Sequence, residues 1–186
     1  MKLIAGVDEV GRGSLIGPVY AAAVILNNTI NKKLLKDSKK LSKNKREFLA
    51  KYIKKNSIWA TGKASIKEIE KMNILHASLL AMKRAIKKLK RKPKLVLIDG
   101  NKLPEIKNYK LKSIIKGDQK IASISAASII AKVTRDKIIT NLGKNFKDYN
   151  WDKNSGYGTR EHLKTIKKLG ITKHHRKTFS PINKKI

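Results

Sequence analysis

Five apolar runs along the chain have the composition and the boundaries of buried strands. Glycine, proline or charged residues flank most of them, and several of the runs are rich in β-branched side chains. The first two runs are close in sequence, so we expect them to pair as a hairpin. The predicted strands cover residues 3–7, 18–26, 58–65, 94–98 and 111–115.

Between these runs, apolar residues recur at helical spacing. The longest such pattern, residues 66–91, places apolar side chains alternately four and three positions apart, which predicts one buried stripe made of Leu75, Leu79, Met82, Ile86 and Leu89. Ser42 is an N-cap candidate for a helix over residues 43–55, and Thr159 for a helix over residues 160–169 that Gly170 ends. A further helix is predicted over residues 121–140, followed by an irregular segment over residues 141–157.

A hairpin followed by helices that alternate with strands favours an α/β fold with a mixed central sheet. The sequence shows no internal repeat and no low-complexity linker, so we expect one domain over residues 1–186. No stretch reaches the roughly 20 apolar residues of a membrane span, and no cysteine is present. These features predict a soluble, cytoplasmic protein.

Charge narrows the class of partner. The chain has 45 Lys and Arg against 13 Asp and Glu, a formal net charge of +32. Such an excess favours a polyanion, most commonly nucleic acid, although the abundance of Lys, Ile and Asn also fits a coding bias toward AT-rich codons. Charge therefore supports nucleic acid as the partner and leaves both explanations of the excess open.

Carboxylates are scarce, and four of them stand out by position. Asp8 and Glu9 follow the first apolar run, Asp99 follows the fourth, and Asp118 lies after the fifth beside Gly117. Acids at the ends of core strands are costly unless a cation compensates their desolvation. Without cysteines or suitably spaced histidines, oxygen-seeking Mg²⁺ or Mn²⁺ are the expected ions, and two of them suit phosphodiester hydrolysis.

Other polar residues carry weaker signals. His76 and His162 fit structural or surface positions, and His174 and His175 fit a basic tail. Asp136 follows Arg135 in a helical pattern, which favours a structural ion pair.

Several segments together resemble the bacterial type of ribonuclease HII. They occur in the family's order and span nearly the whole chain: GVDEVGRGSLIGPVYAAAVIL (6–26), DSKKLS (37–42), NILHASLLAM (73–82), IDGN (98–101), KGD (116–118), SAASIIAKVTRD (125–136), GYGT (156–159) and HHRKTF (174–179).

The resemblance implies an RNase H-like fold with a helical C-terminal part. It implies cleavage of the RNA strand of RNA–DNA hybrids and incision 5′ of single ribonucleotides in duplex DNA, leaving 3′-hydroxyl and 5′-phosphate ends. It also assigns roles to individual residues: Asp8, Glu9, Asp99 and Asp118 are the catalytic metal ligands, Gly11, Arg12 and Gly13 read the 2′-hydroxyl, and Tyr157 packs on the following deoxyribose. Ser155 departs from the lysine that many members have before the Gly-Tyr pair.

Two other functions remain open from the residues alone. A non-catalytic nucleic-acid-binding protein would use the same charge without needing the acids, and another metal-dependent phosphotransferase would keep the acids without selecting a 2′-hydroxyl. The sequence contains no clamp-binding motif, and we expect a monomer without an obligate protein partner.

Overall fold

The computed structural model describes residues 3–35 and 41–184 and contains a five-stranded mixed sheet. The strand order is β3-β2-β1-β4-β5, with β1 antiparallel to β2, β2 antiparallel to β3, and β1, β4 and β5 mutually parallel. This arrangement confirms the predicted hairpin and mixed sheet. The strands are β1 Ile4–Val10, β2 Val19–Leu26, β3 Ser57–Ala64, β4 Leu95–Asp99 and β5 Leu111–Ile114.

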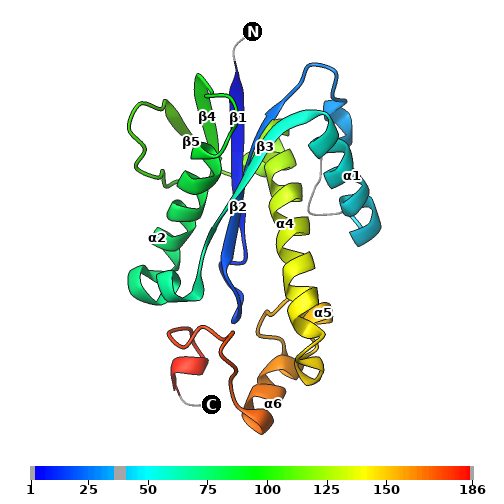
Figure 1. The fold of residues 1–186 in the computed structure, drawn as a ribbon, viewed down its shortest axis with the longest axis vertical. Helices are drawn as coiled ribbons and strands as arrows, with labels where there is room; N and C mark the ends of the chain where they lie inside the picture. Colours follow the sequence, from blue (N-terminus) through cyan, green and yellow to red (C-terminus); the bar gives the residue numbers. More distant parts are fainter. Residues whose placement is uncertain (1–2, 36–40, 185–186) are drawn as a thin grey trace.

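Helices cover both faces of this sheet (Figure 1). The helix α2 (Ile66–Lys87) packs on one face, and α1 (Lys43–Lys55) and α4 (Ala122–Gly143) pack on the other. Strand alternation divides β2 between the two cores: Ala21 and Ala23 face α2, whereas Ala22 and Val24 face α4. Burial on both faces explains the uninterrupted apolar run in this strand.

A close approach of α4 to β1 depends on Gly6. A Cβ on this residue would lie 2.1 Å from the carbonyl carbon of Ser123. The small residues at the start of α4 have the same effect from the other side, because Ser123, Ala126 and Ala127 are all buried. The helix therefore lies directly against the strand that carries the Asp-Glu pair.

The helix α2 departs from the continuous helix predicted over residues 66–91. Asn73 has φ 65°, and its side-chain oxygen accepts from the Leu75 and His76 amides at 2.9 and 3.2 Å. Asn73 therefore caps a second helical segment. Met82 and Ile86 are buried as predicted, but the centre of the stripe also contains the small residues Ala77, Ala81 and Ala85.

The predicted helix caps are confirmed. Ser42 caps α1, and Thr159 caps α6 (Arg160–Leu169), which Gly170 ends. Residues 37–40 of the DSKKLS motif lie outside the described residues. The remaining helices are short: the 3-10 turns η1 (Lys32–Leu35), η3 (Lys147–Tyr149) and η4 (Ile182–Lys184), and the α-helical turns α3 (Gly117–Lys120) and α5 (Trp151–Asn154).

The C-terminal part lies beyond one end of the sheet, where α4 extends past the strands (Figure 1). The prediction of an irregular segment over residues 141–157 is wrong in part, since α4 continues to Gly143 and α5 follows. Trp151 is fully buried there and packs against Phe146 and Tyr149, which gives this region its own small core.

The interpretation of His174 and His175 as part of a basic tail is wrong for His175. His175 and Arg176 are fully buried, and Ile16 forms a β-bridge with His175. No helix within residues 3–35 and 41–184 is both long and apolar enough to cross a membrane.

Candidate active site

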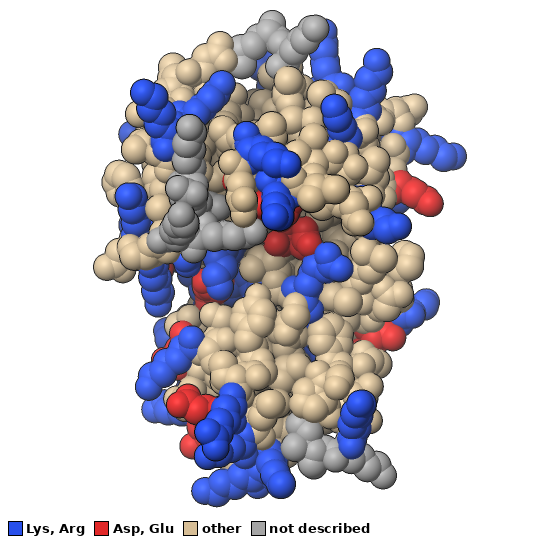
Figure 2. Space-filling model, turned by 180° about the vertical axis from the view of Figure 1, so that it is seen from behind, with Lys and Arg blue, Asp and Glu red and all other residues tan. Residues whose placement is uncertain are grey.

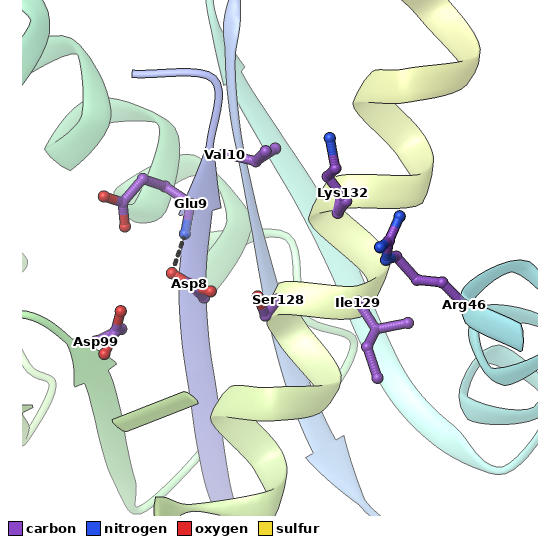
Figure 3. Close-up of a pocket in the computed structure, with 8 residues that line it drawn as sticks. All are labelled: Asp8, Glu9, Val10, Arg46, Asp99, Ser128, Ile129 and Lys132. Carbon is purple, nitrogen blue, oxygen red and sulfur yellow. Dashed lines mark hydrogen bonds between the residues drawn. The ribbon is translucent and has the colours of Figure 1, made fainter. Parts of the chain in front are cut away.

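Asp8, Glu9 and Asp99 come together at one edge of the sheet. Strands β1 and β4 are parallel, and Val7 pairs with Ile98, so Asp8 and Asp99 occupy neighbouring positions at the carboxyl ends of their strands. All three carboxylates line one pocket of about 330 Å³ (Figure 3). The structure thus brings together three of the four acids that the sequence singled out.

Burial and mutual repulsion shape the electrostatics of this pocket. Burial raises the pKa of Asp8 well above its usual value, and the charges of Glu9 and Asp99 add to the increase, whereas a hydrogen bond from Ser128 opposes it. Burial likewise raises the pKa of Glu9, although Arg12, 3.3 Å away, opposes that increase. The protein alone therefore compensates these negative charges incompletely.

Asp118 lies beside this pocket and does not line it. It is 2% exposed, in the first turn of α3, and it borders a separate cavity of about 100 Å³ with Lys32, Leu35 and Ser125. One hydrogen bond connects α3 to the pocket: the Gly117 amide donates to Asp99 Oδ1 at 2.7 Å. Asp118, the fourth predicted acid, is therefore linked to the pocket indirectly, because its chain neighbour Gly117 is hydrogen-bonded to Asp99.

The donor set of the pocket fits a hard divalent cation. Within the described ranges, no three Asp, Glu or His side chains already form a cluster close enough to hold a metal ion. However, Asp8, Glu9 and Asp99 offer only carboxylate oxygens, which are the ligands that Mg²⁺ and Mn²⁺ prefer. A cation bound among them would offset the repulsion between them.

Three pocket residues were not singled out in the sequence. Ser128 and Lys132 lie one helical turn apart on α4, and Arg46 reaches the pocket from α1 (Figure 3). The spacing of Ser128 and Lys132 by four positions was the available signal, but the fold was needed to place that face beside Asp8. On the face shown in Figure 2, acidic side chains lie in a hollow near the middle, with Lys and Arg around them.

Lys132 also corrects the interpretation of Asp136. Its ammonium forms the ion pair with Asp136 at 2.9 Å, whereas Arg135 is fully buried and turned elsewhere. The predicted ion pair exists, with a different cation.

The glycine loop, residues 11–17 between β1 and β2, and the loop that contains Tyr157 lie side by side next to this pocket. Ser14 and Tyr157 form a β-bridge, and the Leu15 amide donates to the Gly156 carbonyl at 2.8 Å. Gly13 is exposed, and a Cβ on it would lie 3.8 Å from the Tyr157 ring. The loop that follows the Asp-Glu pair and the tyrosine thus form one surface, although more than 140 positions separate them in the chain.

Gly11 permits this loop to pass over Arg135. Its φ is +90°, in the left-handed region that glycine adopts most readily. A Cβ there would lie 2.2 Å from Arg135 Nε, so the site excludes any side chain.

Comparisons with known proteins agree with this geometry. The family model described as Ribonuclease HII matches residues 5–182. The ribonuclease HII of Pelagibacter ubique (strain HTCC1062) is 80% identical over 183 residues, which cover 98% of each chain. The crystal structure of ribonuclease H2 from Pyrococcus horikoshii OT3 is 28% identical with a TM-score of 0.80, covering 97% of this chain and 95% of that one.

A more distant structure shares the fold alone. Bst-RNase HIII, crystallised in complex with Mn²⁺, is 18% identical with a TM-score of 0.76, and the match covers 98% of this chain and 68% of that one. The sheet and helices described above are therefore those of the RNase H-like fold. On the full-length family match and the 80% identity, the chain belongs to the ribonuclease HII family and is an endoribonuclease that acts on the RNA of RNA–DNA hybrids.

Proposed function

We propose that this enzyme both cleaves the RNA strand of RNA–DNA hybrids and incises duplex DNA 5′ of single embedded ribonucleotides, leaving 3′-hydroxyl and 5′-phosphate ends. One observation carries the proposal: the carboxylate pocket lies next to the loop of Gly11–Gly13 and the ring of Tyr157. In this arrangement the acids could act on a phosphodiester while the neighbouring loop recognises the sugar attached to it.

Asp8, Glu9, Asp99 and Asp118 are proposed as the residues that hold Mg²⁺ or Mn²⁺. Three of them line one pocket, and the fourth follows the residue that is hydrogen-bonded to Asp99. When two such ions are bound, they supply activation of the attacking water and stabilisation of the leaving oxygen. The Mn²⁺ of the Bst-RNase HIII structure supports this class of ion.

Gly11, Arg12 and Gly13 are proposed to read the 2′-hydroxyl, and Tyr157 to pack against the next sugar. The 2′-hydroxyl is the group that distinguishes RNA from DNA at a given position, and it both donates and accepts hydrogen bonds. Gly13 is exposed and carries no side chain, so its backbone is open to such a group. The half-buried Tyr157 ring, 5.9 Å from the Arg135 guanidinium, is held in place to support a sugar.

The rest of the chain fits a substrate with a phosphate backbone. Arg46 and Lys132 line the pocket together with the acids, and the net charge of +32 favours association with polyanions. We further propose that residues 1–186 form one catalytic domain that works as a monomer in the cytoplasm, in the repair of ribonucleotide-containing DNA, without an obligate protein partner.

The test is an end-labelled DNA duplex carrying one ribonucleotide, incubated with Mg²⁺ or Mn²⁺ beside an all-DNA duplex and an EDTA control. A single metal-dependent nick on the 5′ side of the ribonucleotide is expected. Nicking of the all-DNA duplex would reject the 2′-hydroxyl reader. Cleavage of a full RNA–DNA hybrid without any nick at a single ribonucleotide would restrict the enzyme to hybrids.

A further inference from the structure

Two buried arginine side chains, Arg135 and Arg176, form hydrogen bonds to the glycine loop. Arg176 and Arg135 are both fully buried, and in the described parts of the chain carbonyl and hydroxyl oxygens accept their hydrogen bonds. Arg176 Nε donates to the Gly17 carbonyl at 2.8 Å, and its Nη1 donates to the Arg12 carbonyl at 3.0 Å. One side chain thus joins both ends of the loop.

The bond to Arg12 determines where the next amide points. A trans peptide group is planar, and its C=O and N–H point in opposite directions. Because the Arg12 carbonyl points toward the buried Arg176, the N–H of Gly13 points away from it, on the exposed side of the loop. No residue within the described ranges accepts from this Gly13 amide, so it remains available to a ligand.

Arg135 contacts other residues of the same loop. Its Nη2 donates to Ser14 Oγ at 2.7 Å and to the Ile16 carbonyl at 3.1 Å, and its Nη1 donates to the Ser155 carbonyl at 3.0 Å. It therefore connects the glycine loop with the Tyr157 loop. Arg176, in contrast, is the group that orients the Arg12–Gly13 peptide.

The arrangement needs arginine at position 176. Nε and Nη1 belong to one rigid planar fork, which reaches two carbonyls at once, whereas a lysine has a single ammonium on a flexible stem. The fork is kept at an energetic cost, since burial and, to a smaller extent, the charge of Arg135 lower the pKa of Arg176 to about 9.

We propose that Arg176 is a positioning residue for ribonucleotide recognition, which turns the Arg12 carbonyl inward and thereby presents the Gly13 amide to the oxygen of the 2′-hydroxyl. This inference rests on the proposed function, in which the glycine loop reads that hydroxyl. Arg176 itself does not need to touch the substrate.

The test compares Arg176→Lys with wild type and with the control Arg84→Lys. Arg84 also donates to a backbone carbonyl, that of Lys63, and to Glu68, but it lies on α2 outside the loop. For each protein, kcat/KM for nicking at one ribonucleotide, the Kd for an all-DNA duplex and Tm are measured.

Arg176→Lys is expected to lower kcat/KM about tenfold or more, as the loss of a hydrogen bond from a charged donor implies, while the Kd for the all-DNA duplex stays unchanged. Arg84→Lys is expected to change neither quantity. Unchanged kcat/KM, or equal losses in cleavage and in all-DNA binding, would overturn the proposal. Wild-type enzyme that shows no preference for the ribonucleotide would refute the proposed function instead.

A second measurement tests the role of the Gly13 amide and can be made even if Arg176→Lys does not fold. In the Asp8→Asn variant, which is expected to bind without cutting, the NMR resonance of the Gly13 amide is followed during titration with each duplex. The ribonucleotide-containing duplex is expected to shift this resonance, and the all-DNA duplex to shift it much less. The same shift with both duplexes would contradict the assigned role of the amide.

Discussion

His175 Nε2 lies 3.3 Å from His162 Nε2, inside the core of the C-terminal part. The indole of Trp151 donates to the same His162 nitrogen at 3.1 Å, so that nitrogen accepts and His162 Nδ1–H donates to the Tyr157 carbonyl at 2.9 Å. His175 Nδ1 accepts from the Thr172 amide at 2.9 Å, which leaves its Nε2–H to donate to His162. These four hydrogen bonds can form together only when both imidazole rings are neutral.

This pair predicts a loss of stability in acid. Burial lowers the pKa of both histidines, to about 4 for His175, where the charge of His162 contributes further. Unfolding returns each pKa to about 6.5, so protons bind the unfolded chain more readily. The free energy of unfolding therefore has its full value above pH 6.5. It decreases as the pH falls from there toward 4, by an amount on the order of 2 kcal/mol for His175.

The measurement is Tm between pH 4 and 8. His175→Gln is expected to lower Tm at neutral pH and to flatten its dependence on pH below 6.5. His76→Gln, at an exposed position on α2, is expected to leave the slope unchanged. A wild-type Tm that stays constant from pH 7 to 4.5 would contradict the neutral pair.

Substitution of Asp8 by Asn is expected to abolish metal-dependent nicking and to leave duplex binding intact or tighter, because the variant lacks a buried carboxylate that lies, in the proposed site, next to the substrate phosphate. Asp99→Asn is expected to behave in the same way. Gel-shift titration in EDTA measures binding, and the nicking assay measures activity. Near-normal cleavage by either variant would refute the assignment of these acids.

Metal binding itself has a readout that does not need substrate. Mg²⁺ or Mn²⁺ at about 100 times its Kd is expected to raise the wild-type Tm by roughly 5 to 10 °C, since a ligand that binds only the folded state stabilises it. Asp8→Asn is expected to lose most of this increase. Asp152→Asn, which removes an exposed carboxylate on α5 away from the pocket, serves as the control and is expected to retain it.

Gly13→Ala is expected to separate activity from stability. The added Cβ has only the Tyr157 ring nearby, at 3.8 Å, so Tm is expected to change little. On the exposed side of the loop, however, the methyl group would obstruct the approach of a ribose, and nicking is expected to fall at least about tenfold.

Gly6→Ala is the matched comparison. Its Cβ would lie 2.1 Å from the backbone of Ser123, so α4 has to move away from β1, and the loss of stability is expected to reach several kcal/mol. Denaturant unfolding distinguishes the two variants. Equal stabilities would contradict the tight contact between β1 and α4.

Tyr157→Ala is expected to weaken the preference for a single ribonucleotide more than it weakens general duplex binding. Tyr157→Phe keeps the ring and is expected to keep most of the preference. The ratio of kcat/KM for a single-ribonucleotide duplex to that for a full hybrid measures the effect. Equal losses on all substrates would argue against a role of the ring in selection.

Local patterns in the sequence predicted most of the fold because the responsible interactions are local. Ser42 and Thr159 cap the expected helices, since a side-chain oxygen two or three positions before the free amides is a feature of the sequence itself. Asn73 is the same kind of signal, but the apolar periodicity around it concealed the interruption in α2.

The parts that were predicted wrongly depend on contacts between distant positions. Trp151, His175 and Arg176 are buried only because α4, α5 and the C-terminal segment meet the loop after β1. Their local surroundings are rich in Lys, Asn and Asp, which suggests an exposed segment. The carboxylates of the pocket were recognised because each follows an apolar run of the sequence, whereas Arg46 and Ser128 have no such local signal.

The hydrogen bond from Arg176 to Arg12 spans 164 positions, and it has a consequence for the order of synthesis. A ribosome adds Asp8, Glu9 and the glycine loop first, and it adds the side chain of Arg176 only 164 positions after Arg12. If the proposed role of Arg176 holds, a nascent chain can assemble its sheet and its acids without yet recognising a ribonucleotide. Under that proposal, recognition of a ribonucleotide has to wait until residues 174–176 have left the exit tunnel.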